Sequence, residues 1–421
     1  MATGTGKTLT ACVAIGFLSR SLATNRKSVL VVIVCPYIHV VDQWQKALEA
    51  QNQPSLAAYE SKNLWEKRFK EITQDLALFP GKTAYIVTTI ATFKSKVFQD
   101  RYSTLRTVES IFVADEVHHF GSKTLSRVLP PKAKYRLGLS ATPDRHLDKT
   151  GTARIYDYFG PAVYKLDLKA AIEMGVLCTY EYKPRICHLS LEETLFYAEI
   201  SEQIGHLLKG REFYELSKAE EEKMGKLLRQ RSAILGTSMD KQAKFLKDFR
   251  SQAHKKHQLV YCSQGNSPVY DTMGRHIEYV GSKMTSLGMR FATYEASTPR
   301  LERLEILKDF SRGALDVILS MKCLDEAVDI PEAQTSYFLA SGTNPREFIQ
   351  RRGRVLRQHP GKTHAEIWDY IALPSIEANR EFPDAEKLIL KRELDRAYEL
   401  AEAASNSEEA KHVLDGIKIE L

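Results

Sequence analysis

The sequence lacks the features that would place it outside the soluble proteins of the cytoplasm. No apolar run approaches the roughly 20 residues needed to cross a bilayer, and no signal peptide precedes the first motif. The six cysteines are scattered without a Cys-x-x-Cys pair, which argues against a zinc site and indicates reduced thiols. Repeats and low-complexity tracts are absent too. We therefore expect a cytoplasmic protein with no membrane partner.

The bulk composition is that of an ordinary globular protein. Hydrophobic residues make up 43% and charged residues 27% of the 421 residues, which suits two or three domains with cores of their own. The net charge of +7 is mildly basic. A polyanionic partner is therefore permitted, although the charge alone does not require one.

Short apolar runs alternate with helical patterns along the chain, which is typical of parallel α/β sheets. The expected strands fall in two series, at 28–35, 84–88, 111–114 and 135–139, and then at 258–262, 290–293, 316–319, 335–339 and 365–370. Between the series, apolar residues recur at helical spacing, at Phe196, Ile200, Ile204 and Leu207. The prediction is an α/β protein whose parts are a first lobe (1–165), a linker and helical insertion (166–250), a second lobe (251–375) and a C-terminal helical extension (376–421).

Residues 2–8 form a phosphate-binding motif, Ala-Thr-Gly-Thr-Gly-Lys-Thr. The small residues Gly4, Thr5 and Gly6 allow backbone N–H groups to close around a triphosphate. Lys7 can then reach the β- and γ-phosphates, and the Thr8 hydroxyl can bind Mg²⁺. The apolar run that follows predicts a helix whose N-terminus points at the anion. The alternative is an ordinary turn rich in glycine and threonine, because short motifs recur by chance.

The beginning of this motif is unusual. The general pattern opens with a glycine where this sequence has Met1, and the apolar strand that normally precedes the loop is not in the sequence. We therefore expect an upstream domain or a partner subunit to supply that strand. Without it, we expect weak ATP binding and a partly unfolded first lobe.

A second motif, at 111–116, is an apolar strand that ends in two carboxylates. Asp115 is placed to bind Mg²⁺, usually through water, and Glu116 to orient or deprotonate an attacking water. Alone, a strand followed by Asp-Glu is weak evidence, because a solvated turn has the same sequence. Its position a domain's length after the phosphate loop, and the Val117-His118 that follows, favour an ATP site.

These motifs resemble those of the superfamily 2 helicases and translocases, in the branch marked by Asp-Glu-x-His. Further segments match that family in the same order: Cys35-Pro36 with Gln43-Trp44, Thr89–Thr92, Ser140–Pro143, Leu324–Pro331 and Gln350–Arg357. The resemblance extends from residue 2 to about residue 370. It implies two RecA-like lobes, ATP and Mg²⁺ as cofactors, and a nucleic acid as the partner.

The resemblance also implies roles for single residues. It assigns the coupling of nucleotide state to domain movement to His118, Ser140 and Thr142. It places Asp329 near the ribose, and it assigns contacts with the nucleic-acid backbone to Pro36, Gln43, Thr89 and Thr92. Trp44 could stack on a base, but an aromatic residue on a helix is most often buried, so we favour core packing.

Three polar residues of the last motif, Gln350, Arg354 and Arg357, fall at i, i+4 and i+7, on one face of an expected helix. An arginine presented in this way can stabilise charge on a transferring γ-phosphoryl group, which is worth about 10³–10⁵ in rate. Because the phosphate loop and the arginines belong to different predicted lobes, hydrolysis would require the lobes to close. The alternative is a solvated basic helix.

The sequence therefore predicts an ATP-dependent helicase or translocase. The segment Ser140–Arg145 and the helical insertion resemble the group of the repair helicase XPB, the phage helicase UvsW and the helicase subunits of restriction or defence systems, which favours double-stranded DNA and, in a bacterium, the nucleoid. Lys226, Arg229 and Arg231 could line a duplex, although a solvated helix face is the simpler interpretation. The alternatives are an RNA-stimulated ATPase and a truncated nucleic-acid-binding remnant without catalysis.

Overall fold

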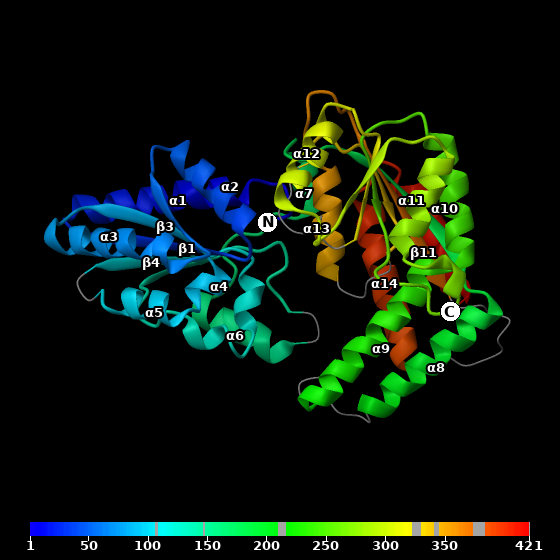
Figure 1. Ribbon diagram of the computed structural model, residues 1–421, viewed down its shortest axis with the longest axis horizontal. Coiled ribbons are helices and arrows are strands. Elements are labelled where there is room, and N and C mark those ends of the chain that lie inside the picture. The colour runs from blue at the N-terminus through cyan, green and yellow to red at the C-terminus, as the bar shows by residue number, and fades with distance from the viewer. Residues whose placement is uncertain are drawn as a thin grey trace. The chain divides into compact units, whose positions relative to one another are not determined.

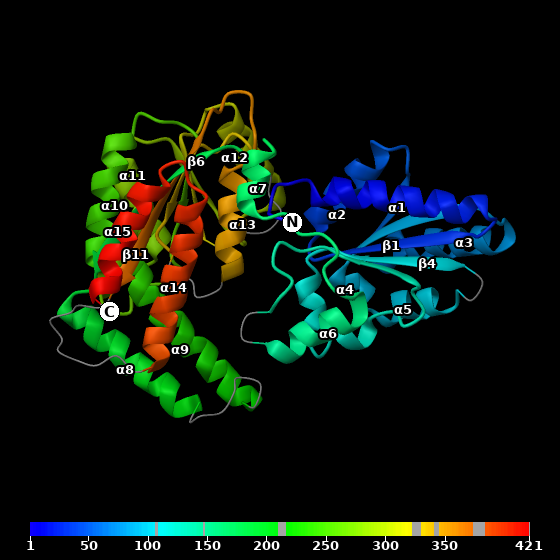
Figure 2. The same cartoon turned by 180° about the vertical axis from the view of Figure 1, so that it is seen from behind.

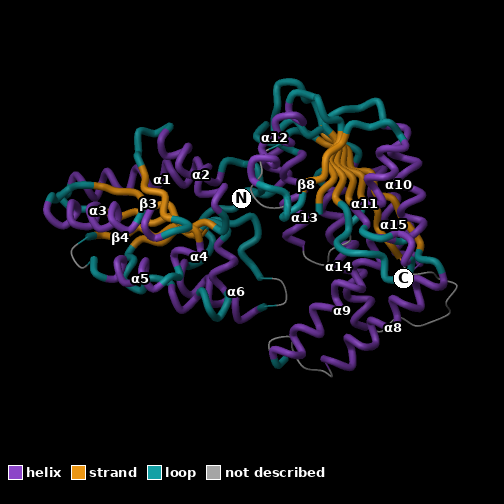
Figure 3. Tube along the Cα trace, in the orientation of Figure 1, coloured by secondary structure: helices purple, strands orange, loops and turns teal. Residues whose placement is uncertain are grey.

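The computed structural model describes residues 1–105, 108–145, 148–208, 216–321, 330–340, 345–373 and 384–420 (Figure 1). These residues form two compact units that divide after Leu166, close to the predicted end of the first lobe. Each unit has a parallel sheet of its own, drawn in orange in Figure 3. Asp329 and most of the predicted motif Leu324–Pro331 lie outside the described residues. Within the described ranges, no helix is long and apolar enough to cross a bilayer.

The first unit is built on a five-stranded parallel sheet with the strand order β2-β3-β1-β4-β5. Its strands are β1 (Val29–Cys35), β2 (Ser55–Ala58), β3 (Thr83–Thr89), β4 (Glu109–Ala114) and β5 (Tyr135–Gly138). Its helices are α1 (Lys7–Thr24), α2 (Ile38–Glu49), α3 (Glu66–Leu78), α4 (Ile90–Phe93), α5 (Lys96–Ser103) and α6 (Lys149–Phe159). Figure 1 shows α1 and α2 on one face of this sheet, and α4, α5 and α6 on the other.

The central strand of this unit explains why the sheet forms. Every residue of β1 is buried, as expected for a strand that is covered on both faces and made almost wholly of Val, Ile and Leu. On one face, the ring centroid of Phe93 lies 5.6 Å from that of Phe98 and 5.4 Å from that of Phe112. The parallel strand order brings the carboxyl ends of β3, β1, β4 and β5 to one edge, where the polar residues that follow them meet.

The second unit contains a six-stranded parallel sheet with the order β6-β11-β10-β7-β9-β8. Its strands are β6 (Tyr180–His188), β7 (Gln258–Tyr261), β8 (Phe291–Tyr294), β9 (Val317–Ser320), β10 (Thr335–Phe338) and β11 (Ala365–Leu373). Its helices are α7 (Leu168–Glu173), α8 (Leu191–Leu208), α9 (Lys218–Thr237), α10 (Met239–Gln252), α11 (His276–Ser286), α12 (Arg300–Ser311), α13 (Pro345–Val355), α14 (Asp384–Glu402) and α15 (Ser407–Glu420).

All nine predicted strands are present, with small differences at their ends, and the structure adds β2 and β6. The addition of β6 corrects the predicted linker and insertion over 166–250, because this strand is an edge of the second sheet and α10 packs against it. Tyr180, Tyr182 and Pro184 are buried and alternate with half-buried polar residues. That alternation is the signal for a strand that the sequence analysis overlooked.

The insertion itself is the helical hairpin of α8 and α9, which projects from the second unit in Figures 1 and 2. Its core includes Ile200 and Ile204, with Leu207 packed against them, as the helical spacing predicts, whereas Phe196 is exposed. Lys226 and Arg229 are exposed, as expected for a solvated face. Arg231 is not: its side chain is buried, and its guanidinium lies over the ring of Tyr197 at 5.8 Å from the centroid.

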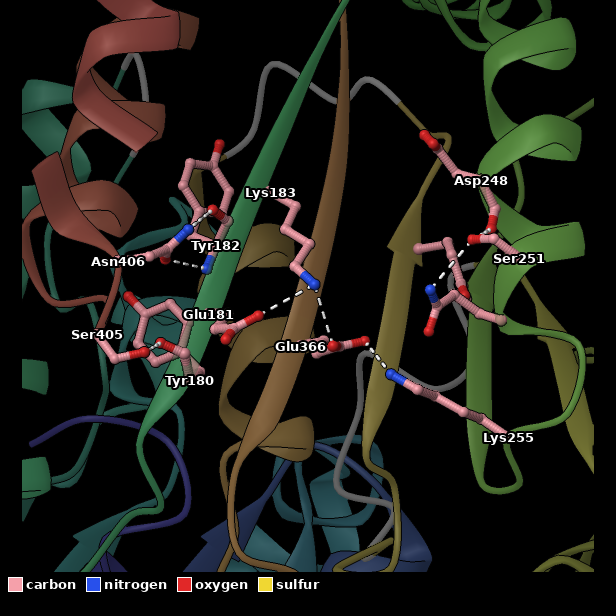
Figure 4. A network of polar contacts seen from close by, with 12 residues as sticks. Tyr180, Glu181, Tyr182, Lys183, Asp248, Ser251, Lys255, Glu366, Ser405 and Asn406 are labelled. Atoms are coloured by element: carbon pink, nitrogen blue, oxygen red, sulfur yellow. Dashed lines mark hydrogen bonds and ion pairs between the residues drawn. The ribbon is translucent and has the colours of Figure 1, made fainter. Parts of the chain in front are cut away.

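The C-terminal helices close the free edge of β6. In the turn between α14 and α15, the Asn406 amide accepts a hydrogen bond from the backbone N–H of Tyr182 and donates one to its carbonyl, both at 2.9 Å (Figure 4). The backbone N–H of Ser405 donates to the carbonyl of Tyr180. These bonds satisfy backbone groups that an open edge strand would leave unpaired, so the predicted extension is an integral layer of this unit.

A chain of ion pairs extends from Glu181 and Lys183 of β6 across β11 (Figure 4). Lys183 contacts Glu181 at 3.0 Å and Glu366 of β11 at 3.1 Å, and Lys255 reaches Glu366 at 2.8 Å. The positive charges of both lysines lower the pKa of Glu366 against the opposing effect of burial. The network therefore joins the edge strand β6 to its neighbour β11 and to the turn that follows α10.

One buried lysine of α10 makes the stability of this unit depend on pH. Lys241 is fully buried, its Nζ donates to the carbonyl of Leu339 at 3.1 Å, and burial lowers its pKa from 10.5 to about 8. The charges of Asp369, Glu393 and Arg396 also act on it. Between these pH values the unfolded chain holds a proton that the folded chain has released, so this group raises the free energy of unfolding as pH increases.

We predict that Lys241→Met flattens this rise. Between pH 8 and pH 10, urea unfolding should show a stability gain for the wild type, relative to the variant, of at most about 3 kcal/mol. Comparing the two proteins at each pH cancels the titration of all other groups. Parallel curves for the two proteins would contradict the assignment.

Candidate active site

The predicted first-lobe residues lie at the carboxyl edge of the first sheet. Pro36 directly follows β1, whose last residue pairs in register with Thr89 of β3. Asp115 directly follows β4, and Ser140 comes two residues after the end of β5. The charge of Lys7 acts on both Asp115 and Glu116, so the phosphate loop lies at the same edge.

The phosphate loop has the backbone conformation that anion binding requires. Gly4 and Gly6 have φ values of 85° and 81°, in the left-handed region where glycine is unstrained. Gly6 is the N-cap of α1, and no atom lies within 4 Å of the position that a Cβ would take there. Exposed N–H groups at the start of an 18-residue helix favour a phosphate at this place.

Asp115 is a buried carboxylate with both oxygens bonded. Its Oδ2 accepts a hydrogen bond from the Trp44 indole at 2.8 Å, and its Oδ1 accepts one from the backbone N–H of Glu116 at 3.0 Å. Burial, and then the charge of Glu116, raise the pKa of Asp115, whereas Trp44 and Lys7 act in the opposite direction. A cation beside this carboxylate would offset the cost of its burial.

Glu116 adopts a conformation that is uncommon for any residue except glycine, with φ 48° and ψ 57°. Its Oε2 lies 3.3 Å from Nδ1 of His118. Burial alone would raise the pKa of Glu116, but the His118 bond and the charge of Lys7 outweigh it and lower the pKa below the usual value. Glu116 is therefore held as a carboxylate, the form that can accept a proton from water.

The three predicted coupling residues form one connected chain. His118 Nδ1 lies 3.4 Å from the Ser140 hydroxyl, which accepts a hydrogen bond from the backbone N–H of Thr142 at 3.1 Å. The backbone N–H of Val117 also donates to the carbonyl of Leu139. The turn after β4 and the turn after β5 are thus bonded to each other.

Arg145 strengthens this connection in a way that the sequence analysis missed. Its Nη1 donates to the carbonyl of His118 at 2.5 Å, and its Nε donates to Asp148 at 2.6 Å. A Cβ at Gly121 would lie 2.3 Å from Cδ of Arg145, and one at Gly151 would lie 2.6 Å from its Nε. The arginine therefore occupies space that two glycines leave open. Gly121 precedes Arg145 by 24 residues, so no local pattern indicates that contact, whereas Gly151 follows Arg145 by only six.

The residues assigned to nucleic acid differ in exposure. Gln43 is exposed on α2 and Pro36 is half-buried. Thr89 and Thr92 are buried, and their hydroxyls bond to each other at 3.2 Å while Thr89 caps the N-terminus of α4. A phosphate contact in this conformation would therefore come from the backbone of that turn. Trp44 is fully buried, which confirms the expectation of core packing.

In the second unit, α13 carries Gln350 and Arg354, but it ends at Val355. Arg357 lies beyond the helix, and its backbone forms an antiparallel bridge with Leu177. The expectation of a single helical face for Gln350, Arg354 and Arg357 is therefore wrong for the last of them. Arg354 is buried, and burial lowers the pKa of Arg357. Asp329 belongs to the part of the chain that is not described.

The residues of the first unit fit Mg²⁺ and ATP. Among the described residues, no group of three or more His, Cys, Asp or Glu side chains is placed to hold a metal. Mg²⁺ does not require such a cage, because it is commonly bound by one or two carboxylates together with substrate phosphates and water. The first unit offers donors of that kind, because Thr8 lies in the first turn of α1 and Asp115 directly follows β4.

Two family models match the chain at these sites. Residues 1–145 match "Type III restriction enzyme, res subunit", and residues 239–359 match "Helicase conserved C-terminal domain". Together they span more than half of the chain. The chain belongs to the superfamily 2 helicases. Its two units are the RecA-like lobes of that family, within the group of XPB and restriction-type helicases.

Individual relatives agree with this placement. The chain is 28% identical over 260 residues to "DNA 3'-5' translocase XPB2" of Sulfurisphaera tokodaii, which covers 59% of this chain and 56% of the relative. A stretch of 93 residues is 33% identical to "UvrABC system protein B" of Thermotoga neapolitana, covering 20% of this chain and 14% of that protein. The chain therefore spans only about half the length of the translocase and less of the second relative.

A solved structure shares the fold. The structure titled "ATP-dependent Type ISP restriction-modification enzyme LlaBIII bound to DNA" aligns with 96% of this chain and 28% of its own chain, with a TM-score of 0.57 and 14% sequence identity. At that identity the likeness concerns the fold alone.

We predict that Arg145 is needed for ATP turnover. Arg145→Ala should lower turnover by about 10- to 100-fold, the usual cost of losing a residue that orients catalytic groups. Gly121→Ala should lower it as well, because the new methyl group would lie 2.3 Å from Cδ of Arg145 and 2.4 Å from the backbone oxygen of Gly151, so that both the Arg145 side chain and the backbone beside it must shift. Arg68→Ala, at an exposed arginine of α3, is the control and should keep full activity. Steady-state ATP hydrolysis measures all three. Normal turnover in folded Arg145→Ala would show that the contacts of Arg145 with His118 and Asp148 are dispensable.

Proposed function

We propose that this chain is the motor of an ATP-dependent helicase or translocase that acts on double-stranded DNA in repair, restriction or defence. The observation that carries the proposal is the convergence of a helix N-terminus, Lys7, Asp115 and Glu116 at one sheet edge. A cation, two carboxylates of different protonation behaviour and a phosphate cradle suit the hydrolysis of a nucleoside triphosphate.

The residues of the first lobe divide the chemistry among themselves. The loop N–H groups and Lys7 bind the phosphates, and Thr8 and Asp115 hold Mg²⁺, which neutralises phosphate charge when it is bound. Glu116 orients a water for attack on the γ-phosphorus and receives its proton. His118 keeps Glu116 in the orientation and charge state that this role needs.

The resemblance to the family also gives roles to residues of the second lobe. Arg354 and Arg357, with Gln350, stabilise the charge that develops on the transferring phosphoryl group, and Asp329 contacts the ribose. The turns that carry His118, Ser140 and Thr142 are bonded to each other, so a change in the bound phosphate would shift both turns. Through that shift they couple the nucleotide state to the movement of the lobes. Resemblance to the family supports these assignments.

DNA is the favoured partner, in a cytoplasmic and nucleoid-associated setting. The relative with the longest match reported above is named as a DNA translocase, and the mildly basic charge suits a polyanion. We propose that Gln43, Pro36 and the turn of Thr89 and Thr92 contact the phosphate backbone. These contacts would hold the strand without selecting a sequence.

We predict that duplex DNA stimulates ATP hydrolysis more than single-stranded DNA or duplex RNA does. Glu116→Gln should abolish turnover with every nucleic acid while it preserves nucleotide binding, because the amide cannot accept the proton. Initial rates at equal nucleotide concentrations measure the stimulation. Stronger stimulation by RNA would favour the RNA-stimulated ATPase, and binding of DNA without any hydrolysis would favour the non-catalytic alternative.

We also propose that an apolar strand from an upstream domain or a partner subunit pairs with β5. Among the described residues β5 pairs only with β4, and none of its residues is fully buried. Leu9, Val13 and Phe17 recur every four residues on α1 and are 44–73% exposed. An added segment that reached α1 would also cover this apolar stripe.

We predict that a version of the chain extended upstream by an apolar strand binds ADP more tightly and unfolds at a higher temperature. A matched extension with proline at the strand centre should give neither gain, because proline removes a ladder hydrogen bond. Fluorescent ADP titration and thermal unfolding measure the two effects. Equally tight binding by the chain with and without the extension would show that the strand is dispensable.

A further inference from the structure

Trp44 connects two parts of the proposed site that are far apart in the sequence. It lies on α2, directly after the exposed Gln43, and it is itself fully buried. Its indole N–H donates to Oδ2 of Asp115, 71 residues away, at 2.8 Å. An indole nitrogen can only donate and an ionised carboxylate can only accept, so this hydrogen bond is charge-assisted.

The bond removes the rotational freedom of the Asp115 carboxylate. Oδ1 is already held by the backbone N–H of Glu116 at 3.0 Å, and the backbone N–H of Asp115 donates to the carbonyl of Val34 at 2.9 Å. With Trp44 on Oδ2, each oxygen has one fixed donor. A carboxylate has about four acceptor positions, so positions for a metal or its water remain.

We propose that Trp44 is a positioning residue: its indole N–H orients Asp115 for Mg²⁺ and links helix α2, which carries Gln43, to the metal-binding carboxylate. The proposal rests on the proposed function, since it assigns Mg²⁺ to Asp115 and nucleic acid to α2. A displacement of α2 by a bound strand would move the donor of Asp115, which gives nucleic acid a direct route to the metal site.

The test is Trp44→Phe, which keeps an aromatic ring in the core but removes the indole N–H together with the volume of the second ring, a loss of volume that the Trp65→Phe control shares. Fluorescent ADP is titrated against the protein at increasing Mg²⁺ and again with EDTA. We expect the Mg²⁺ concentration for half-maximal tight binding to rise about 10-fold, as is usual when a residue that orients a metal ligand is lost. Binding in EDTA should not change.

Trp65→Phe is the matched control. Trp65 is buried in the same unit, among Phe69 and Phe98, and its indole nitrogen has no hydrogen-bond partner. This variant should therefore bind like the wild type at every Mg²⁺ concentration. Asp115→Asn tests whether Trp44 acts through Asp115. In that background, Trp44→Phe should have no further effect on the Mg²⁺ dependence of ADP binding.

Hydrolysis gives a second measure of the same bond. Trp44→Phe should lose more of the duplex-stimulated rate than of the basal rate at saturating Mg²⁺, whereas a general loss of stability would lower both equally. Equal losses, or an unchanged Mg²⁺ dependence of ADP binding, would overturn the proposal. A wild type that shows no Mg²⁺-dependent binding would instead overturn the proposed function.

A measurement on an intact Trp44 covers the case in which Trp44→Phe does not fold. With Trp65 and Trp368 both replaced by phenylalanine, Trp44 is the single tryptophan of the chain. Its emission should shift when ADP and Mg²⁺ are added together, and it should stay constant with ADP in EDTA. If ADP binds with Mg²⁺ present but the Trp44 emission does not shift, the proposed link between the Trp44 indole and a metal-binding Asp115 is contradicted.

Discussion

Two neighbouring carboxylates lie at the end of β4, Asp115 buried and Glu116 half-buried, and the groups around them offset the cost of their charges. A buried anion is costly unless donors or positive charges accompany it. Trp44 supplies a donor from α2, His118 supplies one from the following turn, and Lys7 supplies a charge from the phosphate loop. The same groups that stabilise the fold locally are thus the groups that a nucleotide and its metal would contact.

The compensation differs between the two acids, and this difference gives them different roles. Asp115 remains a carboxylate whose burial disfavours its charge, which suits a partner that brings a cation. Glu116 has its charge favoured by His118 and Lys7, which suits a proton acceptor. Arg145 and Ser140 then hold the His118 turn against the end of β5. A change at the phosphate site therefore has a bonded path to the neighbouring strand.

Much of this could be predicted from sequence. Parallel strands buried on both faces leave continuous apolar runs such as β1, so both lobes could be predicted. The phosphate loop and the Asp-Glu pair are local motifs, so they could be recognised before the structure placed them at one sheet edge. Edge strands leave weaker signals: β2 is short, and β6 alternates polar and aromatic residues around a proline. Arg357 was placed on a helix because periodicity does not show where a helix ends.

The sequence by itself determined the fold class, the position of the phosphate loop and the two carboxylates, because each depends on residues close together in the chain. Only the tertiary structure decided that Trp44 donates to Asp115, that Arg145 fits between Gly121 and Gly151, and that the α14–α15 turn seals the edge of β6. Trp44 and Asp115 are 71 residues apart, Gly121 and Arg145 are 24 apart, and Tyr182 and Asn406 are 224 apart. Such pairs have no local pattern, because they arise only when packing of the sheet brings their elements together.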